Sequence, residues 1–529
     1  MNRFLHPLLI AVLAGLSFAC QPSSSTMGIQ TLQGELEGTV SKHNPQIRVF
    51  KGIPYAAPPL NELRWQPPQA APAWNGTLQA TEFGASCSQP TFSSVFVWRR
   101  GDFVTSEDCL YLNIWAQEEA ATQPVMVWFH GGAHTSGQGH SEIFDGAQLA
   151  AQGVLLVSIN YRLGPLGFLA HPWLADESDQ DSAGNYGLLD KVAALNWVRD
   201  NIAQFGGDAN NVTIFGQSAG SQSVCSLMTS PMAEGLFHKA IGQSAACVGP
   251  PPRRDANGFE RGEQLVAATN AANLDALRAV SADDLLAASE TTGWANASRI
   301  VIDGWVLPEA QVEVFRRNEQ HKMPLMLGSL ANEGIELFPR NDALSLAQFQ
   351  AFAEQLVGSH APDLIAAYQT ELSQSPGHAH HAISTDLFMT FGMRRWAQYS
   401  ERSGAPTYLY FMDHVPPAFH LYMPEDPHLE LEEGPRSSGA YHSGDLAFVF
   451  GNTNHVGLHW QADDHRLSNA MVKYWTNFAK NGDPNGEGLA PWQPFEAETF
   501  TTQLLRPEPE SGPGVKQAAL SAFAAANPL

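Results

Sequence analysis

The sequence is poor in basic side chains. Its 529 residues include 29 Lys and Arg against 53 Asp and Glu, which gives a formal net charge of −24 at pH 7. Nucleic acid phosphates and anionic membrane surfaces are bound through clustered cations, so this balance excludes a general affinity for nucleic acids and argues against a charged lipid surface. We interpret the acidic excess as an aid to solubility.

Long apolar runs are also scarce, and the N-terminal one is short. Arg3 gives this segment a positive start, and the apolar residues 8–18 are too few for a permanent membrane span. We therefore predict a signal peptide over residues 1–19. Residues 16–20, LSFAC, resemble a bacterial lipobox, although Ser17 fits its position less well than an aliphatic residue would. Cleavage there would leave Cys20 as a lipidated N-terminus and residues 20–27 as a flexible tether.

An ordinary secretory signal, cut near the same point, is the alternative. The lipobox predicts a protein anchored in a bacterial cell envelope, in the periplasm or at the outer membrane, and the ordinary signal predicts a secreted protein. In the first case, the lipid anchor would be the route of contact with the membrane.

Cysteine is rare, with five in the whole chain. Assigning Cys20 to a lipid leaves four, an even number in an oxidising compartment, with three possible pairings. Cys87 with Cys109 is the natural first pair, because it closes a loop of about 20 residues and is worth about 3 kcal/mol in the chain-entropy model. Cys225 with Cys247 would tie a helix to the end of the next strand, and two buried free thiols are the alternative.

Internal repeats and linkers are not visible either. Hydrophobic residues make up 44% of the chain and charged residues 16%, so a large core is available. We predict one domain over residues 28–529, with helical insertions at about 250–320 and 340–440. We expect several buried strands that alternate along the chain with helices, one of which has an apolar stripe at 185–205. Such alternation favours a mostly parallel sheet covered on both faces. These strands are 124–129, 154–160, 212–215, 240–242 and 324–327.

A G-x-S-x-G motif stands at residues 216–220, with Ser218 at its centre. In such a motif the Ser occupies a strained turn between a strand and a helix, and the glycines avoid a clash of Cβ atoms where the two cross. The apolar run before it and the stretch 221–228 after it, free of Gly and Pro, suit this geometry. A bare motif of this kind also arises by chance, so Ser218 needs partners elsewhere in the chain.

Candidate partners follow in the order Ser, acid, His. A neutral Ser hydroxyl is a poor nucleophile without a base and an acid that orients the base. Glu333 follows the strand 324–327 on a Gly-bounded turn, and His442 precedes an apolar stretch. The sequence spacing alone does not exclude a purely structural role for Glu333 or His442. The developing oxyanion needs N–H donors, and we expect them from the backbone of Gly131, Gly132 and Ala219.

Taken together, these motifs resemble those of a known family. The chain resembles the type-B carboxylesterase/lipase family, the cholinesterase-like branch of the α/β-hydrolases. Two stretches match its signatures, FGGDANNVTIFGQSAG and EDCLYLNIWAQ. Supporting pieces run in family order between about residues 36 and 492: FKGIPYAAPP, WFHGGAHTSG, NYRLGPLGFL, GNYGLLD, HSGDLAFVFG and KYWTNFAKNGDPN.

The resemblance implies an α/β-hydrolase fold, with a central, mostly parallel sheet flanked by helices and helical insertions that form a gorge. It implies that Ser218 is the nucleophile, Glu333 the acid and His442 the base. Gly131, Gly132 and Ala219 would form the oxyanion hole. A disulfide between Cys87 and Cys109 would match the family's first, whereas Cys225 and Cys247 do not fall where the second usually lies, and stay open.

We therefore expect a serine hydrolase of small to medium carboxylic esters that acts through an acyl-enzyme and needs no metal or cofactor. Gln217 replaces the Glu that many members carry before the Ser, which lowers the expectation of a quaternary ammonium substrate. Alternatives are a specialised lipase or cholinesterase-like hydrolase and, from another class, an inactive binding or adhesion protein on the same fold. For the hydrolase, we expect a small-molecule ester as the binding partner and no nucleic acid partner.

One further cluster needs an interpretation. His378, His380 and His381 form a His-rich patch, but no Cys or carboxylate lies close to them in the sequence. Metal ions in proteins are usually held by such mixed sets of ligands. We interpret the patch as a surface loop and expect no metal there.

Overall fold

The computed structural model describes residues 28–90, 103–117, 122–248, 258–296, 299–335, 337–420 and 429–528. The expected signal peptide, the lipidation site Cys20 and the tether lie outside these residues and stay predictions. In the described ranges, no helix has the length and apolar character needed to cross a membrane.

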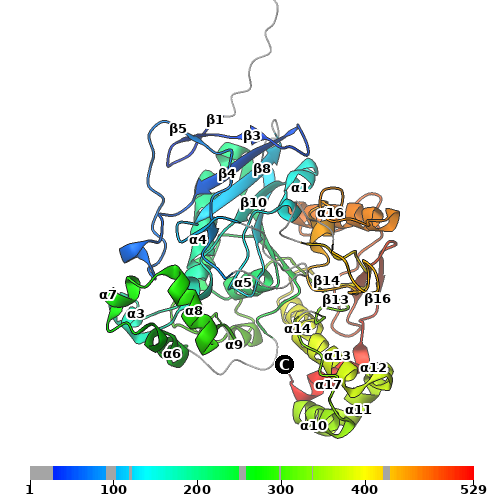
Figure 1. Ribbon diagram of the computed structural model, residues 1–529. Helices are drawn as coiled ribbons and strands as arrows, with labels where there is room; N and C mark the ends of the chain where they lie inside the picture. Colours follow the sequence, from blue (N-terminus) through cyan, green and yellow to red (C-terminus); the bar gives the residue numbers. More distant parts are fainter. Residues whose placement is uncertain are drawn as a thin grey trace, which may run out of the picture.

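An eleven-stranded sheet organises the described part of the molecule (Figure 1). The six pairings that join β10 to β15 are all parallel, and antiparallel strands extend the sheet at both ends. The order across the sheet is β16 (Glu510–Gly512), β15 (Thr502–Leu505), β14 (Thr407–Met412), β13 (Leu325–Leu330), β12 (Lys239–Gln243), β11 (Gly207–Gln217), β9 (Gln123–Phe129), β10 (Leu155–Ile159), β8 (Tyr111–Gln117), β4 (Ile47–Pro54) and β3 (Thr39–Val40). All five stretches that we expected to be buried strands are strands in this sheet.

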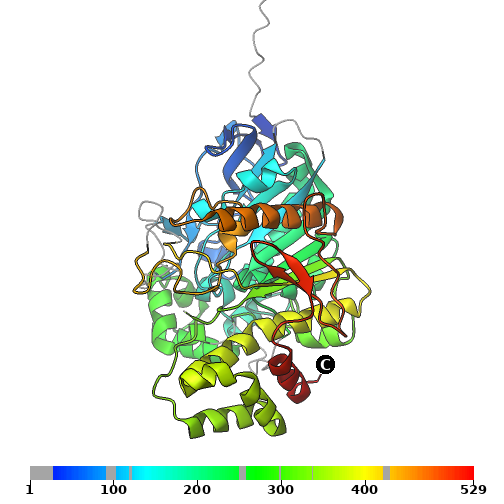
Figure 2. The same cartoon turned by 90° about the vertical axis from the view of Figure 1, so that its right-hand side faces the viewer.

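Both faces of the sheet are covered, because alternate side chains of its strands enter two separate cores. In β9, Val125 and Val127 join one core, and Met126 and Trp128 join the other. The first core contains side chains of α4 (Tyr186–Asn201), α5 (Ala219–Leu227) and α14 (Thr390–Glu401). The second contains those of α1 (Ala147–Ala151), α15 (Leu446–Val449) and α16 (Ala462–Asn481), and Figure 2 shows α16 in orange across this face. The helix expected at 185–205 is α4, continued by the 3-10 helix η3 (Ile202–Phe205).

Two groups of helices extend from the sheet, each with its own small core (Figure 1). The first comprises α6 (Phe259–Thr269), α7 (Leu274–Arg278), α8 (Ala282–Thr292) and α9 (Gln311–Arg316). The second comprises α10 (Leu346–Val357), α11 (Ala361–Ala367), α12 (Gln369–Gln374) and α13 (Pro376–Phe388), and the C-terminal α17 (Gln517–Ala526) packs into it. These groups are the expected helical insertions.

The second insertion is shorter than the sequence suggested. The expectation of helices up to residue 440 is wrong, because β14 lies within that range and the described residues 413–440 contain no helix. All six residues of β14, TYLYFM, are buried, so the strand lacks the alternation that marks a half-exposed strand. The signature stretch EDCLYLNIWAQ leads into β8, which begins at Tyr111 and has Leu112 to Ala116 all buried.

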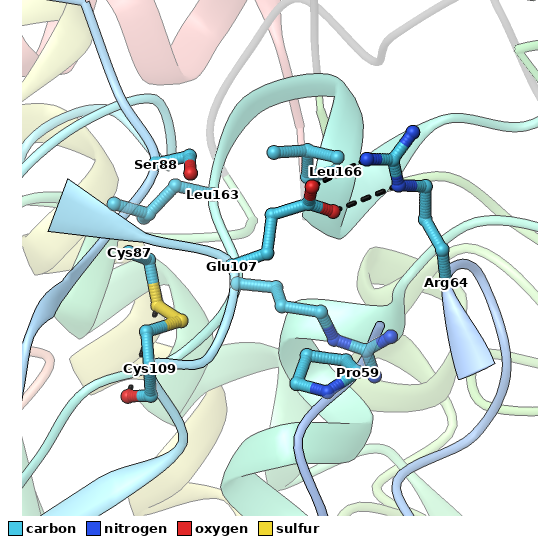
Figure 3. A pocket seen from close by; sticks show the side chains of 9 residues that line it. Pro59, Arg64, Cys87, Ser88, Glu107, Cys109, Leu163 and Leu166 are labelled. Atoms are coloured by element: carbon cyan, nitrogen blue, oxygen red, sulfur yellow. Dashed lines mark hydrogen bonds and ion pairs between the residues drawn. A yellow bond between two sulfur atoms is a disulfide. The ribbon is translucent and has the colours of Figure 1, made fainter. Parts of the chain in front are cut away.

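The expected disulfide between Cys87 and Cys109 is present, and so is the one between Cys225 and Cys247 that the sequence left open. Cys87 is bonded to Cys109, and Cys225 in α5 is bonded to Cys247, just after β12, with Cα atoms 4.9 and 5.7 Å apart. Figure 3 shows the first disulfide beside the carboxylate of Glu107, which forms an ion pair with Arg64. This neighbourhood ties the N-terminal segment to the loop that enters β8.

Candidate active site

Ser218 forms the whole connection between β11 and α5. Its backbone has φ 56° and ψ −124°, a conformation that a non-glycine residue adopts only when its surroundings enforce it. The Ser218 amide donates to the carbonyl oxygen of Gln243 at 2.8 Å, and the Ser218 carbonyl accepts from the amide of Gln222 at 2.9 Å. Ser218 is half-buried whereas Gln217 and Ala219 on either side are buried, so the turn lifts this one residue out of the interior.

The glycines on either side of the turn are required by close packing. A Cβ on Gly220 would overlap the carbonyl oxygen of Phe129 at the end of β9. A Cβ on Gly216 would lie 2.5 Å from the carbonyl carbon of Gly220 and 2.8 Å from the same oxygen of Phe129. Contacts this short do not occur for real side chains, so the steric reason that we inferred from the motif is confirmed.

Glu333 and His442 meet in the interior. Glu333 Oε1 accepts from the amide of Leu330 at 2.8 Å, and His442 Nδ1 donates to Glu333 Oε2 at 2.5 Å. A parallel bridge between Asn332 and Tyr441 brings the two segments together, although they are more than 100 residues apart in the sequence. The Glu333 side chain is fully buried and that of His442 is 3% exposed, so the pair is shielded from water.

Gln217 is a neighbour of His442 that its position in the sequence did not reveal. Its side chain is buried, and its Nε2 lies 3.1 Å from Nε2 of His442. Because Nδ1 of His442 donates to Glu333, Nε2 carries the lone pair and accepts from the Gln217 amide. Gln217 immediately precedes Ser218, so the lone pair of His442 lies next to the serine turn.

The expected oxyanion donors, the backbone amides of Gly131, Gly132 and Ala219, lie just after β9 and at the start of α5. A Cβ on Gly131 would be 3.2 Å from Cβ of Ser218 and 2.8 Å from Oε1 of Gln217, so the end of β9 lies directly against the serine turn. Within the described part of the chain, the amides of Gly131, Gly132 and Ala219 donate to no acceptor. Ala219 is the first residue of α5, where the helix dipole also favours negative charge.

Asp445 is a second buried acid that the sequence did not single out. It follows His442 by three residues, and its Oδ2 accepts from Nε2 of Gln243 at 2.8 Å and from the hydroxyl of Tyr410 at 3.1 Å. Its Oδ1 is buried and accepts from no donor among the residues that the structure describes. Burial raises the pKa of Asp445 from 3.8 to about 6, and the nearby charge of Glu333 acts in the same direction. Gln243 connects this acid to Ser218, because its backbone carbonyl holds the Ser218 amide.

The His-rich patch is not a surface loop, so that interpretation is wrong. His378, His380 and His381 lie on α13, where Nε2 of His381 contacts the carbonyl oxygen of Gly334 at 2.9 Å. His378 contacts Ser375 and Arg340, and His380 packs on Phe352. Among the described residues, no three His, Cys, Asp or Glu are grouped as metal ligands.

A serine turn at the carboxyl edge of a mostly parallel sheet, followed in the chain by an acid and a histidine, is the arrangement of the α/β-hydrolase fold. The model of the Carboxylesterase family matches residues 25–521. The para-nitrobenzyl esterase of Bacillus subtilis (strain 168) is 35% identical over 500 residues, which cover 91% of this chain and 95% of that protein. The fumonisin B1 esterase of Sphingopyxis macrogoltabida is 32% identical over 514 residues, covering 92% and 88%.

Solved structures agree with the sequence comparison. A PNB esterase superposes with a TM-score of 0.77 at 32% identity, and the match covers 94% of this chain and all of the other. The chain therefore belongs to the carboxylesterase family. It is a serine carboxylesterase, a hydrolase of carboxylic esters, as its motifs implied.

Proposed function

We propose that Ser218 is the nucleophile of this carboxylesterase, that His442 is its general base and that Glu333 orients the base. The observation that carries the proposal is the buried hydrogen bond of 2.5 Å between His442 Nδ1 and Glu333 Oε2. The contact between Gln217 and the other ring nitrogen supports it, since it puts the basic lone pair beside the serine turn. The strained backbone of Ser218 is a further support, because strain of this kind gathers at functional sites.

The chemistry follows from these positions. As Ser218 Oγ bonds to the ester carbonyl carbon, its proton passes to Nε2 of His442, and Glu333 stabilises the imidazolium. The amides of Gly131, Gly132 and Ala219 stabilise the oxyanion. Collapse of this intermediate gives the proton of His442 to the leaving alcohol and leaves an acyl group on Ser218. His442 then takes a proton from water as the water oxygen bonds to the acyl carbon, and it gives that proton to Ser218 Oγ as the bond between Oγ and the acyl group breaks and the carboxylic acid leaves.

The Gln217 amide has a place in this sequence of steps. Within the described residues, Ser218 Oγ forms no hydrogen bond with His442, and the Gln217 amide occupies Nε2 instead. Proton transfer requires the hydroxyl at that nitrogen. We propose that the Ser218 hydroxyl replaces the amide at Nε2 when an ester binds, and that Gln217 keeps the imidazole oriented in the free enzyme.

We propose small to medium carboxylic esters as substrates, without a quaternary ammonium group. The neutral Gln217 supports this choice, because it puts an amide where a carboxylate would attract a cation. The names of the relatives, para-nitrobenzyl esterase and fumonisin B1 esterase, describe ester hydrolases of different substrates, in keeping with a site that accepts varied esters. A specialised lipase or cholinesterase-like hydrolase is the alternative.

Hydrolysis of p-nitrophenyl esters from acetate to palmitate, by the wild type and Ser218→Ala in parallel, tests the proposal. We expect the wild type to be most active on the short and medium esters, and the variant to lose about four powers of ten or more in kcat, since triad residues act as a unit. A variant that keeps a tenth of the wild-type rate would remove Ser218 from its role. An optimum at palmitate would favour a lipase, and no activity at all would favour an inactive binding protein.

We also propose that residues 28–529 form one domain, anchored to a bacterial envelope through a lipid on Cys20. The continuous sheet from β3 to β16 supports a single domain, and the LSFAC stretch supports the anchor. Metabolic labelling with palmitate should mark the wild type and not Cys20→Ala. Equal labelling of the two proteins, or none, would exclude lipidation at Cys20.

A further inference from the structure

Arg394 is a buried cation with no partner among the described residues. It lies on α14 with 4% of its surface exposed. Its guanidinium stacks on the ring of Phe500, with 3.4 Å between Cζ and the ring centroid. Nε and Nη1 are buried without an acceptor, and the residue forms no other hydrogen bond or ion pair in the described part of the chain. Because the plane of the guanidinium is stacked on the Phe500 ring, its N–H groups point outward, parallel to the plane of that ring.

The space beside Arg394 is a cavity between α14, the sheet and the C-terminal segment. Figure 2 shows α14 in yellow near the C-terminal residues in red. The cavity has room for one water-sized species. Ser218, Glu333 and His442 do not line it, whereas Tyr410 does, and the Tyr410 hydroxyl donates to Asp445 at 3.1 Å. Its walls combine hydroxyl groups and apolar side chains, from Ser329, Thr390, Thr502, Leu409, Phe411 and Leu520.

The charges around the cavity favour an anion. Burial lowers the pKa of Arg394 to about 10, so the side chain is still a cation at neutral pH. Asp386 lies next to the cavity, since its Oδ1 accepts from the hydroxyl of the lining residue Thr390 at 3.5 Å, but this carboxylate is already engaged by Lys516 Nζ at 2.5 Å and by the Tyr368 hydroxyl at 2.6 Å. Arg395, the next residue on α14, adds another cation, and its guanidinium donates to the carbonyl oxygen of Asn527. Positive charge therefore exceeds negative charge here, although the whole chain is strongly acidic.

We propose that this cavity binds a single small monovalent anion of the size of chloride, held by the guanidinium of Arg394. The charge of the anion compensates a buried cation that has no carboxylate partner among the described residues. The Ser329 hydroxyl donates to Thr390 Oγ1 at 3.4 Å and the Thr390 hydroxyl donates to Asp386 Oδ1 at 3.5 Å, so the guanidinium of Arg394 supplies the donors for the anion. A carboxylate or phosphate is too large for a space that admits one water-sized species. The site is independent of the esterase chemistry.

Crystals of the full mature chain, grown with bromide as the halide, give the direct test. We expect an anomalous bromide peak within hydrogen-bonding distance of the Arg394 guanidinium. A peak of ordinary density without anomalous signal would identify a water and overturn the proposal, as would an empty cavity. This measurement uses the wild type alone, so it decides the question even if variants at this position fail to fold.

The second test compares thermal unfolding in sodium chloride with thermal unfolding in sodium gluconate. Equal ionic strength keeps general screening the same, and gluconate is too large for the cavity. The Tm of the wild type should rise with the logarithm of chloride concentration, because the folded state alone binds the ion. Arg394→Met, which removes the charge at similar size, should show no such rise and should be at least as stable as the wild type in gluconate. Arg395→Met is the matched control and should keep the chloride dependence.

The same chloride dependence in the wild type and in Arg394→Met would overturn the proposal. Loss of the dependence in both variants would overturn it as well, because it would place the effect in the general charge of α14. Esterase activity should be the same in chloride and in gluconate, since none of the three residues that we propose as catalytic lines the cavity.

Discussion

Glu333 and Asp445 are two buried carboxyl groups near His442, and their surroundings differ. Glu333 has a partner for each oxygen, the amide of Leu330 and Nδ1 of His442. Asp445 has two donors on Oδ2 and none on Oδ1. Both acids are fully buried, so the difference lies in their partners and not in their exposure.

This difference separates their roles. A carboxylate that faces an imidazole in a dry interior is favoured as an anion, because it stabilises the imidazolium that forms when the histidine takes a proton. An acid with an unpaired buried oxygen favours its neutral form, and the pKa of Asp445 is raised to about 6 accordingly. We infer that Glu333 acts on the histidine directly, whereas Asp445 holds Gln243 and Tyr410 in place behind it.

The largest expected effect comes from Glu333→Gln. The amide of the new Gln would donate to Nδ1 of His442, so the ring would carry its proton on Nε2 and could not accept one from Ser218. We expect kcat on a p-nitrophenyl ester to fall by about 10⁴-fold, as when a triad acid becomes its amide in another serine hydrolase. A loss of less than tenfold, with the fold intact by circular dichroism, would assign the orienting role elsewhere.

Asp445→Asn should affect stability more than activity. The pKa of Asp445 is raised from 3.8 to about 6 in the folded state, so the folded protein binds this proton more tightly and the acid lowers stability as the pH rises from about 4 to 6. Removing the charge should raise the free energy of unfolding at pH 7 by up to about 3 kcal/mol. Urea unfolding at pH 7 and at pH 4 measures this gain, which should vanish at pH 4.

The activity of the same variant sharpens the comparison with Glu333. Because Asp445 touches no reacting atom, kcat of Asp445→Asn should stay within about tenfold of the wild type. A loss as large as that of Glu333→Gln would show that both acids act on His442. A free energy of unfolding that falls at pH 7 would mean that the ionised carboxylate is the stabilising form.

Gln217→Glu adds a third carboxylate, next to Nε2 of His442, and should have a smaller effect. An anion at this point stabilises the imidazolium, so kcat/KM should fall to half its maximum at a pH about 1 unit higher than in the wild type. Choline esters should also become better substrates relative to neutral esters of the same acyl length. Gln217→Met is the control without charge, and an identical pH profile for Gln217→Glu would exclude electrostatic contact with His442.

Local sequence was sufficient for the serine turn and for most of the sheet. Gly216 and Gly220 are required by contacts with Phe129 and with each other, and such steric rules act over a few residues. The expected strands were found because short apolar runs between turns have few alternatives to burial in a parallel sheet. The strand β14 is a short buried apolar run of the same kind and was missed because the helical pattern that precedes it was extended across it.

The sequence by itself determined the family of the protein and the order of the three residues that we propose as catalytic, Ser218, Glu333 and His442, because the motifs around them are local patterns. Only the tertiary structure decided what surrounds them. The Gln217 amide meets His442 across 225 residues of sequence, Asp445 meets Gln243 across 202, and Arg394 stacks on Phe500 from another part of the chain. Contacts of this kind depend on how whole strands and helices pack, and no short stretch of sequence specifies that packing.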